Sequence, residues 1–274
     1  MKRLLTAAVG VPLSLLAIFQ LPGIWFFAVV LLFLTWGALE YSQLLAPHAP
    51  GAPRWLLLVL VPPAAAALAL TLMPGPAPAG EAWALAGGLF ATVAVATLVL
   101  VAGTPPAQAP AALGILGFGV PYFALPVASL TVIQQLDPWL MILLLAIVWL
   151  GDTAAYYVGS TLGRTTMAPV ISPNKSWEGA VASFLTALVA SAIWSVWRLG
   201  RLDLPLLGVA AVTAVAAQVG DLVESLLKRS VAAKDSGDVL PGHGGMFDRM
   251  DALLFAAPVL LAGLWLIGLD AVSL

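Results

Sequence analysis

Two pairs of carboxylates flank a polar, glycine-rich segment, and their spacing suits the binding of a metal ion. Asp221 and Glu224 lie three residues apart near the end of an apolar stretch. Asp248 and Asp251 lie three residues apart where the next apolar stretch begins. Residues at this spacing share one face of a helix. If the two helices pack antiparallel, the pairs could face one another, and a hard cation such as Mg²⁺ would relieve their mutual repulsion.

Each pair also has an ordinary structural explanation. Asp221 or Glu224 could form a buried ion pair with Lys228, which lies on the same helical face. Asp248 and Asp251 could simply occupy a helix N-terminus, where a negative charge is favoured by about 0.3–1 kcal/mol. That explains one acid better than it explains a pair opposite another pair. We therefore take all four carboxylates, Asp221, Glu224, Asp248 and Asp251, as candidate metal ligands.

The segment between the two acid pairs has the composition of a phosphate-binding site. Lys and Arg are the cations that phosphates need, and dense glycines free the backbone to form an anion-binding nest. His243 could instead be a neutral turn residue, and Lys234 with Asp235 could be an ordinary solvated charge pair. The candidates are Lys228, Arg229, Lys234, Asp235, His243, Gly244, Gly245 and Arg249, with Lys234 and Asp235 ranked as catalytic.

A second polar cluster precedes this segment in the chain. Ser176 is a candidate N-cap for the apolar stretch that follows it, with Glu178 in the first turn, and this local role alone could explain Glu178. Lys175 then lies just ahead of a helix N-terminus, where a phosphate is readily bound. Asp152 could alternatively be a hydrogen-bonded acid between packed helices. The candidate substrate-binding residues of this cluster are Asp152, Ser172, Asn174 and Lys175.

Membrane-spanning helices must position these residues. Of the 274 residues, 62% are hydrophobic and only 9% are charged, and the mean hydropathy is +1.04. A soluble domain of this composition would expose large apolar patches. The absence of cysteine from the sequence excludes a disulfide framework and a thiolate metal site. We predict an all-α polytopic integral membrane protein with a polar active-site cavity on its cytoplasmic side.

Apolar stretches of about 20 residues, the length that crosses a bilayer as a helix, predict nine transmembrane helices. The first is expected to be an uncleaved span, because it has no good small-residue cleavage site. Pro62 with Pro63 and Pro121 with Pro126 predict kinks or interruptions in the third and fifth helices. The nine spans lie near 4–21, 23–42, 55–73, 82–102, 110–133, 138–158, 177–198, 204–228 and 250–270.

The distribution of basic residues predicts the orientation of these helices. With the N-terminus inside, nine Lys and Arg residues fall in inner loops and only Arg198 and Arg201 fall in outer ones. We expect a multi-pass protein of the cell inner (plasma) membrane. Residues 1–140 would form N-terminal transmembrane helices, and residues 141–274 a catalytic region. Its polar loops 159–176 and 229–249 would face the cytoplasm, where nucleotides are found.

The two polar clusters together resemble the signature of a known enzyme family, the phosphatidate cytidylyltransferases or CDP-diacylglycerol synthases. The resemblance is specific across 152–251 and only hydropathic over 1–140. Ser176 stands where many members have Thr, and both carry a hydroxyl. The first part of the match is Asp152-x-Ala154-Ala155-Tyr156 and Ser172-Pro173-x-Lys175-Ser176-x-Glu178-Gly179. The second part is Ser225-x-Leu227-Lys228-Arg229, then Lys234-Asp235-x-Gly237, then Leu240-Pro241-x-His243-Gly244-Gly245-Met246-x-Asp248-Arg249-Met250-Asp251.

This resemblance implies an integral membrane enzyme, typically dimeric, that joins phosphatidate to CTP and releases pyrophosphate. It also implies a metal centre at Asp221 and Asp248 that uses Mg²⁺ and a second, monovalent cation. The implied partners are CTP, phosphatidate, membrane lipid and a second copy of the chain, and no nucleic acid is expected.

Other functions stay open on the residues alone. A cation or proton transporter also carries buried acids, but it would need no glycine-rich phosphate-binding segment. A related CTP-dependent transferase could act on another lipid phosphate, such as that of an isoprenoid-ether lipid, because the lipid groove is not readable from sequence. A catalytically inactive scaffold is disfavoured, because the charged positions of the motif are kept.

Overall fold

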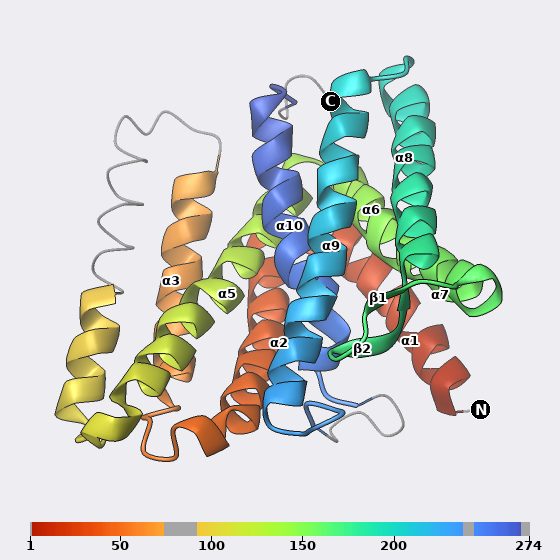
Figure 1. Cartoon of the computed structure of the whole chain (residues 1–274). Coiled ribbons are helices and arrows are strands. Elements are labelled where there is room, and N and C mark those ends of the chain that lie inside the picture. The colour runs from red at the N-terminus through yellow and green to blue at the C-terminus, as the bar shows by residue number, and fades with distance from the viewer. Residues whose placement is uncertain (1, 74–91, 238–243, 270–274) are drawn as a thin grey trace. The chain divides into compact units, whose positions relative to one another are not determined.

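The computed structural model describes residues 2–73, 92–237 and 244–269, and these residues are almost entirely helical (Figure 1). They divide into two compact units, Met1–Val132 with Ser230–Met250, and Ile133–Arg229 with Asp251–Leu274. The first unit takes in α1 (Lys2–Gln20), α2 (Gly23–Leu44), η1 (Ala46–His48), α3 (Leu56–Leu72), a helix over Thr92–Val101, η2 (Pro106–Gln108) and most of α5 (Ala109–Leu136). The second takes in α6 (Pro138–Leu145), η3 (Ala146–Leu150), α7 (Gly151–Leu162), β1 (Thr166–Ala168), β2 (Ser172–Ser176), α8 (Trp177–Leu199) and most of α9 (Leu204–Ser230) and α10 (Phe247–Leu266).

Within the described ranges, six helical segments are long and apolar enough to cross a membrane. They are Gly23–Leu44, Pro106–Leu136, Pro138–Leu162, Trp177–Leu199, Leu204–Ser230 and Phe247–Leu266. The other predicted spans coincide with the shorter apolar helices Gly10–Gln20, Leu56–Leu72 and Thr92–Val101. Several apolar helices thus fit a multi-pass membrane protein, while the count of nine stays a prediction.

The prolines of α3 and α5 do not interrupt these helices. Pro62 and Pro63 lie inside α3, and Pro121 and Pro126 lie inside α5, yet both helices continue through them. Of the two outcomes predicted, an interruption is therefore excluded, and a kink at these prolines stays a prediction. A proline removes one backbone donor, and the remaining hydrogen bonds of so long an apolar segment can still hold it helical.

The first unit has an aromatic core at the cytoplasm-facing end predicted for α2. The Tyr41 ring makes edge contacts with Phe123 and Phe247, at centroid distances of 5.6 Å and 5.9 Å. The Tyr41 hydroxyl donates to the carbonyl of Ile115 at 3.0 Å, which satisfies its buried polar tip. Phe247, the first residue of α10, is fully buried in this cluster.

In the second unit, α9 and α10 pack at unusually short range. A Cβ added to Gly220 of α9 would lie 2.6 Å from the carbonyl oxygen of Asp251 in α10. One added to Gly263 of α10 would lie 2.4 Å from a Val209 methyl of α9. Small residues allow such approach between membrane helices. The contact at Gly220 brings the acid-bearing turns of the two helices together.

The stretch 159–176, predicted to be a loop, is more ordered than expected. Helix α7 continues to Leu162, and β1 and β2 then form an antiparallel hairpin in which Thr166 pairs with Ser176. Ser176 caps α8 as predicted, because its Oγ accepts from the Gly179 N–H at 3.1 Å. The hairpin therefore leads directly into the N-terminus of a membrane helix.

Candidate active site

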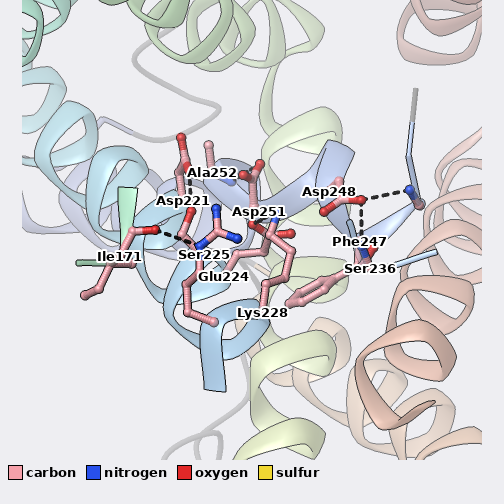
Figure 2. Close-up of polar contacts among 12 residues, drawn as sticks. Ile171, Asp221, Glu224, Ser225, Lys228, Ser236, Phe247, Asp248, Asp251 and Ala252 are labelled. Atoms are coloured by element: carbon pink, nitrogen blue, oxygen red, sulfur yellow. Dashed lines mark hydrogen bonds and ion pairs between the residues drawn. The ribbon is translucent and has the colours of Figure 1, made fainter. Parts of the chain in front are cut away.

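Three carboxylates of the second unit meet where α9 and α10 approach each other. Asp221 and Glu224 come from one turn of α9, and Asp251 comes from α10 (Figure 2). One carboxylate oxygen of each lies within 4.8 Å of the others. Glu224 is buried, with 1% of its surface exposed, and the other two are half-buried. The close approach at Gly220 explains how an acid of α10 reaches the acids of α9.

This donor set fits a hard divalent cation. Carboxylate oxygens are the ligands that Mg²⁺ prefers, and it commonly combines one or two of them with substrate phosphates and water. Three acids this close repel one another unless positive charge lies among them. The structure thus groups three of the four predicted metal ligands, Asp221, Glu224 and Asp251.

Two lysines supply positive charge to this group. The Nζ atom of Lys175, in β2, lies 2.5 Å from Oδ2 of Asp221. The Nζ atom of Lys228 lies 2.7 Å from Oε2 of Glu224, one turn away in α9. Of the two ion pairs considered from sequence for Lys228, the structure forms the one with Glu224. The sequence did not predict the Lys175–Asp221 pair, which joins the two polar clusters.

The hairpin is held against α9 by further contacts. Arg229 donates through Nε to the carbonyl of Ile171 at 3.2 Å, in the β1–β2 turn. Asp152, in the first turn of α7, interacts electrostatically with Asp221 and Lys175, so it belongs to the same charged cluster. Of the remaining residues predicted for this side, Ser172 is half-buried and Asn174 is exposed in β2.

Asp248 belongs to the first unit, where its carboxylate accepts backbone hydrogen bonds. Its Oδ2 accepts from the N–H of Ser236 at 2.9 Å and from the N–H of Gly245 at 2.8 Å (Figure 2). Asp248 lies in the first turn of α10, so the helix N-terminal placement that the sequence allowed holds for it. A cation shared by Asp221 and Asp248 stays a prediction.

The other phosphate-binding candidates lie around this turn. Lys234, Asp235 and Arg249 are exposed, and Gly244 has a φ of 76°, a backbone conformation that favours glycine. The N–H of Gly245 faces the Asp248 carboxylate. His243 lies outside the described residues.

The sequence model of the Cytidylyltransferase family matches residues 1–267. The chain belongs to the cytidylyltransferase family. The match confirms the resemblance drawn from the two polar clusters. It also extends to the N-terminal half, where the resemblance was only hydropathic.

Curated relatives within this cytidylyltransferase family carry the name phosphatidate cytidylyltransferase. The protein from Bacillus subtilis (strain 168) is 44% identical over 117 residues, covering 42% of this chain and 43% of the relative. The protein from Brucella suis biovar 1 (strain 1330) is 40% identical over 150 residues, covering 52% and 54%. The protein from Staphylococcus aureus (strain COL) is 45% identical over 119 residues, covering 42% and 44%. The chain thus spans about half the length of the curated relatives it matches.

One acid of this cytidylyltransferase chain was missed by the reasoning from sequence. Glu40 of α2 is buried, with 3% of its surface exposed. Its Oε2 accepts from the Phe247 N–H at 2.8 Å and from Ser236 Oγ at 3.1 Å. A signal was present, because Glu40 is the only charged residue of the predicted span 23–42. An ionisable residue within a membrane helix is by default a candidate functional residue.

Proposed function

We propose that this chain transfers the cytidylyl group of CTP to phosphatidate, giving CDP-diacylglycerol and pyrophosphate. The observation that carries the proposal is the three-acid group of Asp221, Glu224 and Asp251 with Lys175 and Lys228 at ion-pair distance. Acids of apolar helices in contact with lysines suit a reaction between a nucleotide and a lipid phosphate. Family membership and the names of the curated relatives support the same reaction.

The reaction needs little proton transfer from the protein, but it requires the protein to neutralise negative charge on both substrates. An oxygen of the phosphatidate phosphate attacks the α-phosphorus of CTP, the new P–O bond forms, and the bond to the β-phosphate oxygen breaks. The nucleophile is already an anion, so a strong general base is not essential. Two polyanions must instead be held in line while pyrophosphate leaves, and positioning with charge neutralisation lowers this barrier.

Asp221, Glu224 and Asp251 would hold a Mg²⁺ ion, with Asp248 as a further ligand. When bound, Mg²⁺ supplies charge neutralisation at phosphoryl oxygens. A second, monovalent cation is an expectation from the family resemblance. The acids of the chain orient these positive charges, and the short contact at Gly220 sets the spacing between the α9 and α10 carboxylates.

The basic residues would hold the phosphates. Lys175 and Lys228 pair with carboxylates here and would exchange these partners for phosphate oxygens when the acids take up a cation. Lys175 is well placed for this exchange, because it stands two residues before the N-terminus of α8, where backbone N–H groups also favour an anion. The remaining contacts are assigned to Asp152, Ser172, Asn174, Arg229, Lys234, Asp235, His243, Gly244, Gly245 and Arg249.

The proposed setting is the inner membrane, with the site facing the cytoplasm and the chain acting as a homodimer. Phosphatidate would reach the acids from within the bilayer, and CTP would arrive from the aqueous side. The preponderance of Lys and Arg in the predicted inner loops supports this orientation.

Turnover by the purified protein tests the proposal. The full chain in detergent is given CTP labelled at the α-phosphate, phosphatidate and Mg²⁺, and labelled lipid is separated from nucleotide. Labelled CDP-diacylglycerol with equimolar pyrophosphate is expected, and none should form with chelator. A panel with an isoprenoid-ether lipid phosphate separates the two lipid classes. Ion flux in liposomes without any CTP-dependent lipid product would instead favour the transporter.

A further inference from the structure

Glu40 is a buried acid whose surroundings the proposed chemistry does not explain. It lies four residues before the end of α2, a helix long and apolar enough to cross the membrane. A buried carboxylate in an apolar helix is costly, and it persists where specific contacts offset that cost. Glu40 accepts hydrogen bonds from Ser236 and Phe247, which both lie in the first unit.

Glu40 acts as an external cap for α10. The first N–H groups of a helix have no partner within the helix, so they need acceptors from elsewhere. Phe247 is the first residue of α10, and its N–H donates to Glu40 Oε2 at 2.8 Å. One turn earlier in α2, an added Cβ on Gly37 would lie 3.7 Å from the Phe247 Cα atom. The start of α10 thus packs directly against α2.

Ser236 links Glu40 to Asp248. Its hydroxyl donates to Glu40 Oε2 at 3.1 Å, while its backbone N–H donates to Asp248 Oδ2 at 2.9 Å. Gly245 completes the arrangement by donating its N–H to the same Asp248 oxygen at 2.8 Å. Glu40 of α2 therefore bonds to Ser236 and Phe247, and Asp248 of α10 bonds to Ser236 and Gly245.

Gly245 shows how closely Glu40 is fitted to this turn. A Cβ added there would meet both Glu40 Oε2 and Ser236 Oγ, so these side chains would have to shift to make room for it. A Cβ on Gly237 would lie 3.1 Å from Glu40 Oε1. Both glycines belong to the family motif, so part of that motif accommodates an acid that lies far outside it in sequence.

We propose that Glu40 is a positioning residue for the transfer reaction. Its carboxylate holds Ser236 and the start of α10, and through them it sets the orientation of the Asp248 carboxylate. The inference rests on the proposed function, which places Asp248 among the groups that hold charge at the reacting phosphates. A purely structural Glu40 would affect the stability of the protein but not the turnover of the folded fraction.

Three variants of the full chain separate these roles. Glu40→Ala removes the acceptor of both hydrogen bonds, and kcat should fall about 100-fold, the upper range for losing a group that orients a metal ligand. Glu40→Gln keeps an oxygen that accepts both bonds, so its kcat should exceed that of Glu40→Ala at least about tenfold. Ser42→Ala is the matched control, because Ser42 is also buried in α2 and its hydroxyl donates to the nearby Leu39 carbonyl at 2.8 Å. Its kcat should match that of the unmodified protein.

Hydrogen exchange of the purified protein gives a readout that needs no substrate. Glu40→Ala should speed amide exchange at the start of α10 relative to Ser42→Ala, with little change in the second unit. If the unmodified protein makes no labelled lipid while this local effect appears, the proposed function fails, but the contact by which Glu40 holds the start of α10 is still supported. A Glu40→Ala protein with unchanged kcat, or a Glu40→Gln protein as slow as Glu40→Ala, would overturn the positioning role.

Ser236→Ala covers the case in which Glu40→Ala does not fold. This change removes the hydroxyl bond to Glu40 and leaves the backbone bond to Asp248 in place. A fall in kcat of about tenfold is expected from the loss of one hydrogen bond to a charged group. An unchanged kcat with unchanged exchange at α10 would overturn the proposal.

Discussion

The Nζ atom of Lys175 lies 2.5 Å from Oδ2 of Asp221, which joins the hairpin strand β2 to the acid-bearing turn of α9. About a quarter of each side chain is exposed, 27% for Lys175 and 29% for Asp221. A cation that binds the Asp221 carboxylate would be repelled by the Lys175 ammonium group, so the two positive charges compete for this carboxylate. Metal binding at Asp221 would therefore free Lys175 to bind a phosphate. Lys175 is expected to weaken metal binding and to strengthen phosphate binding.

Replacing Lys175 by Met should separate these two effects. Loss of the competing charge should tighten the binding of Mn²⁺, used as a paramagnetic stand-in for Mg²⁺, as measured by electron paramagnetic resonance without substrates. Turnover should nevertheless fall about 10–100-fold, the range for losing a hydrogen bond between charged groups. Arg164→Met, an exposed cation just before β1, is the control and should change neither quantity. Weaker Mn²⁺ binding in Lys175→Met would contradict the competition.

Replacing the predicted metal ligands by Asn should abolish most activity. Asp221→Asn and Asp248→Asn should each lower the turnover rate at least about 100-fold, the loss expected when a metal-binding carboxylate is removed. Near-normal turnover in either would defeat that assignment.

Asp203→Asn makes the same chemical change at the other end of α9. Asp203 accepts from the Leu206 N–H at 3.0 Å, and Asn caps a helix about as well as Asp. This variant should keep its activity, which shows that the losses at Asp221 and Asp248 do not reflect a general sensitivity to lost charge.

The ion pair of Lys228 with Glu224 makes a prediction about stability. Glu224 is 1% exposed, so Lys228→Met would remove one partner of a buried ion pair, a change that typically costs about 3–5 kcal/mol. The midpoint of unfolding in a denaturing detergent titration should fall accordingly. The double variant Lys228→Met with Glu224→Gln should recover part of the loss, because the buried charge is then absent. A double variant less stable than Lys228→Met would contradict this account.

Gly220 should be intolerant of any side chain. A Cβ there would lie 2.6 Å from the backbone oxygen of Asp251, so Gly220→Ala must push α9 and α10 apart. A displacement of about 1 Å in a reacting constellation can cost about 100-fold in rate, and Mn²⁺ binding should weaken with it. Gly208→Ala is the matched control on the same helix, because nothing lies within 4 Å of its added Cβ. Equal activity of the two variants would exclude the spacing argument.

Contacts between residues close together in the sequence could be predicted, and contacts between separate elements could not. The Ser176 cap was predictable because it involves residues three apart in one helix turn. The Glu224–Lys228 pair was foreseen as one of two options for the same reason. Which acid Lys175 would pair with was not predictable, because β2 and α9 are brought together by the packing of the second unit.

The role of Glu40 could not be predicted from the sequence. Its isolation in an apolar span was visible, but its partners Ser236 and Phe247 lie about 200 residues further along the chain. No periodicity or spacing rule relates positions so far apart. The same holds for Gly220. Only the packing of α10 against α9 shows that there is no room for a side chain at this position.

The sequence by itself determined the membrane class, the family and the kinds of side chain available for phosphate chemistry. These follow from composition and from short motifs, which depend only on neighbours along the chain. Only the tertiary structure decided that Asp251 joins Asp221 and Glu224, that Lys175 neutralises Asp221, and that Glu40 holds the start of α10. Each of these contacts joins separate elements, and their meeting depends on how closely helices can pack, which is a property of the folded chain.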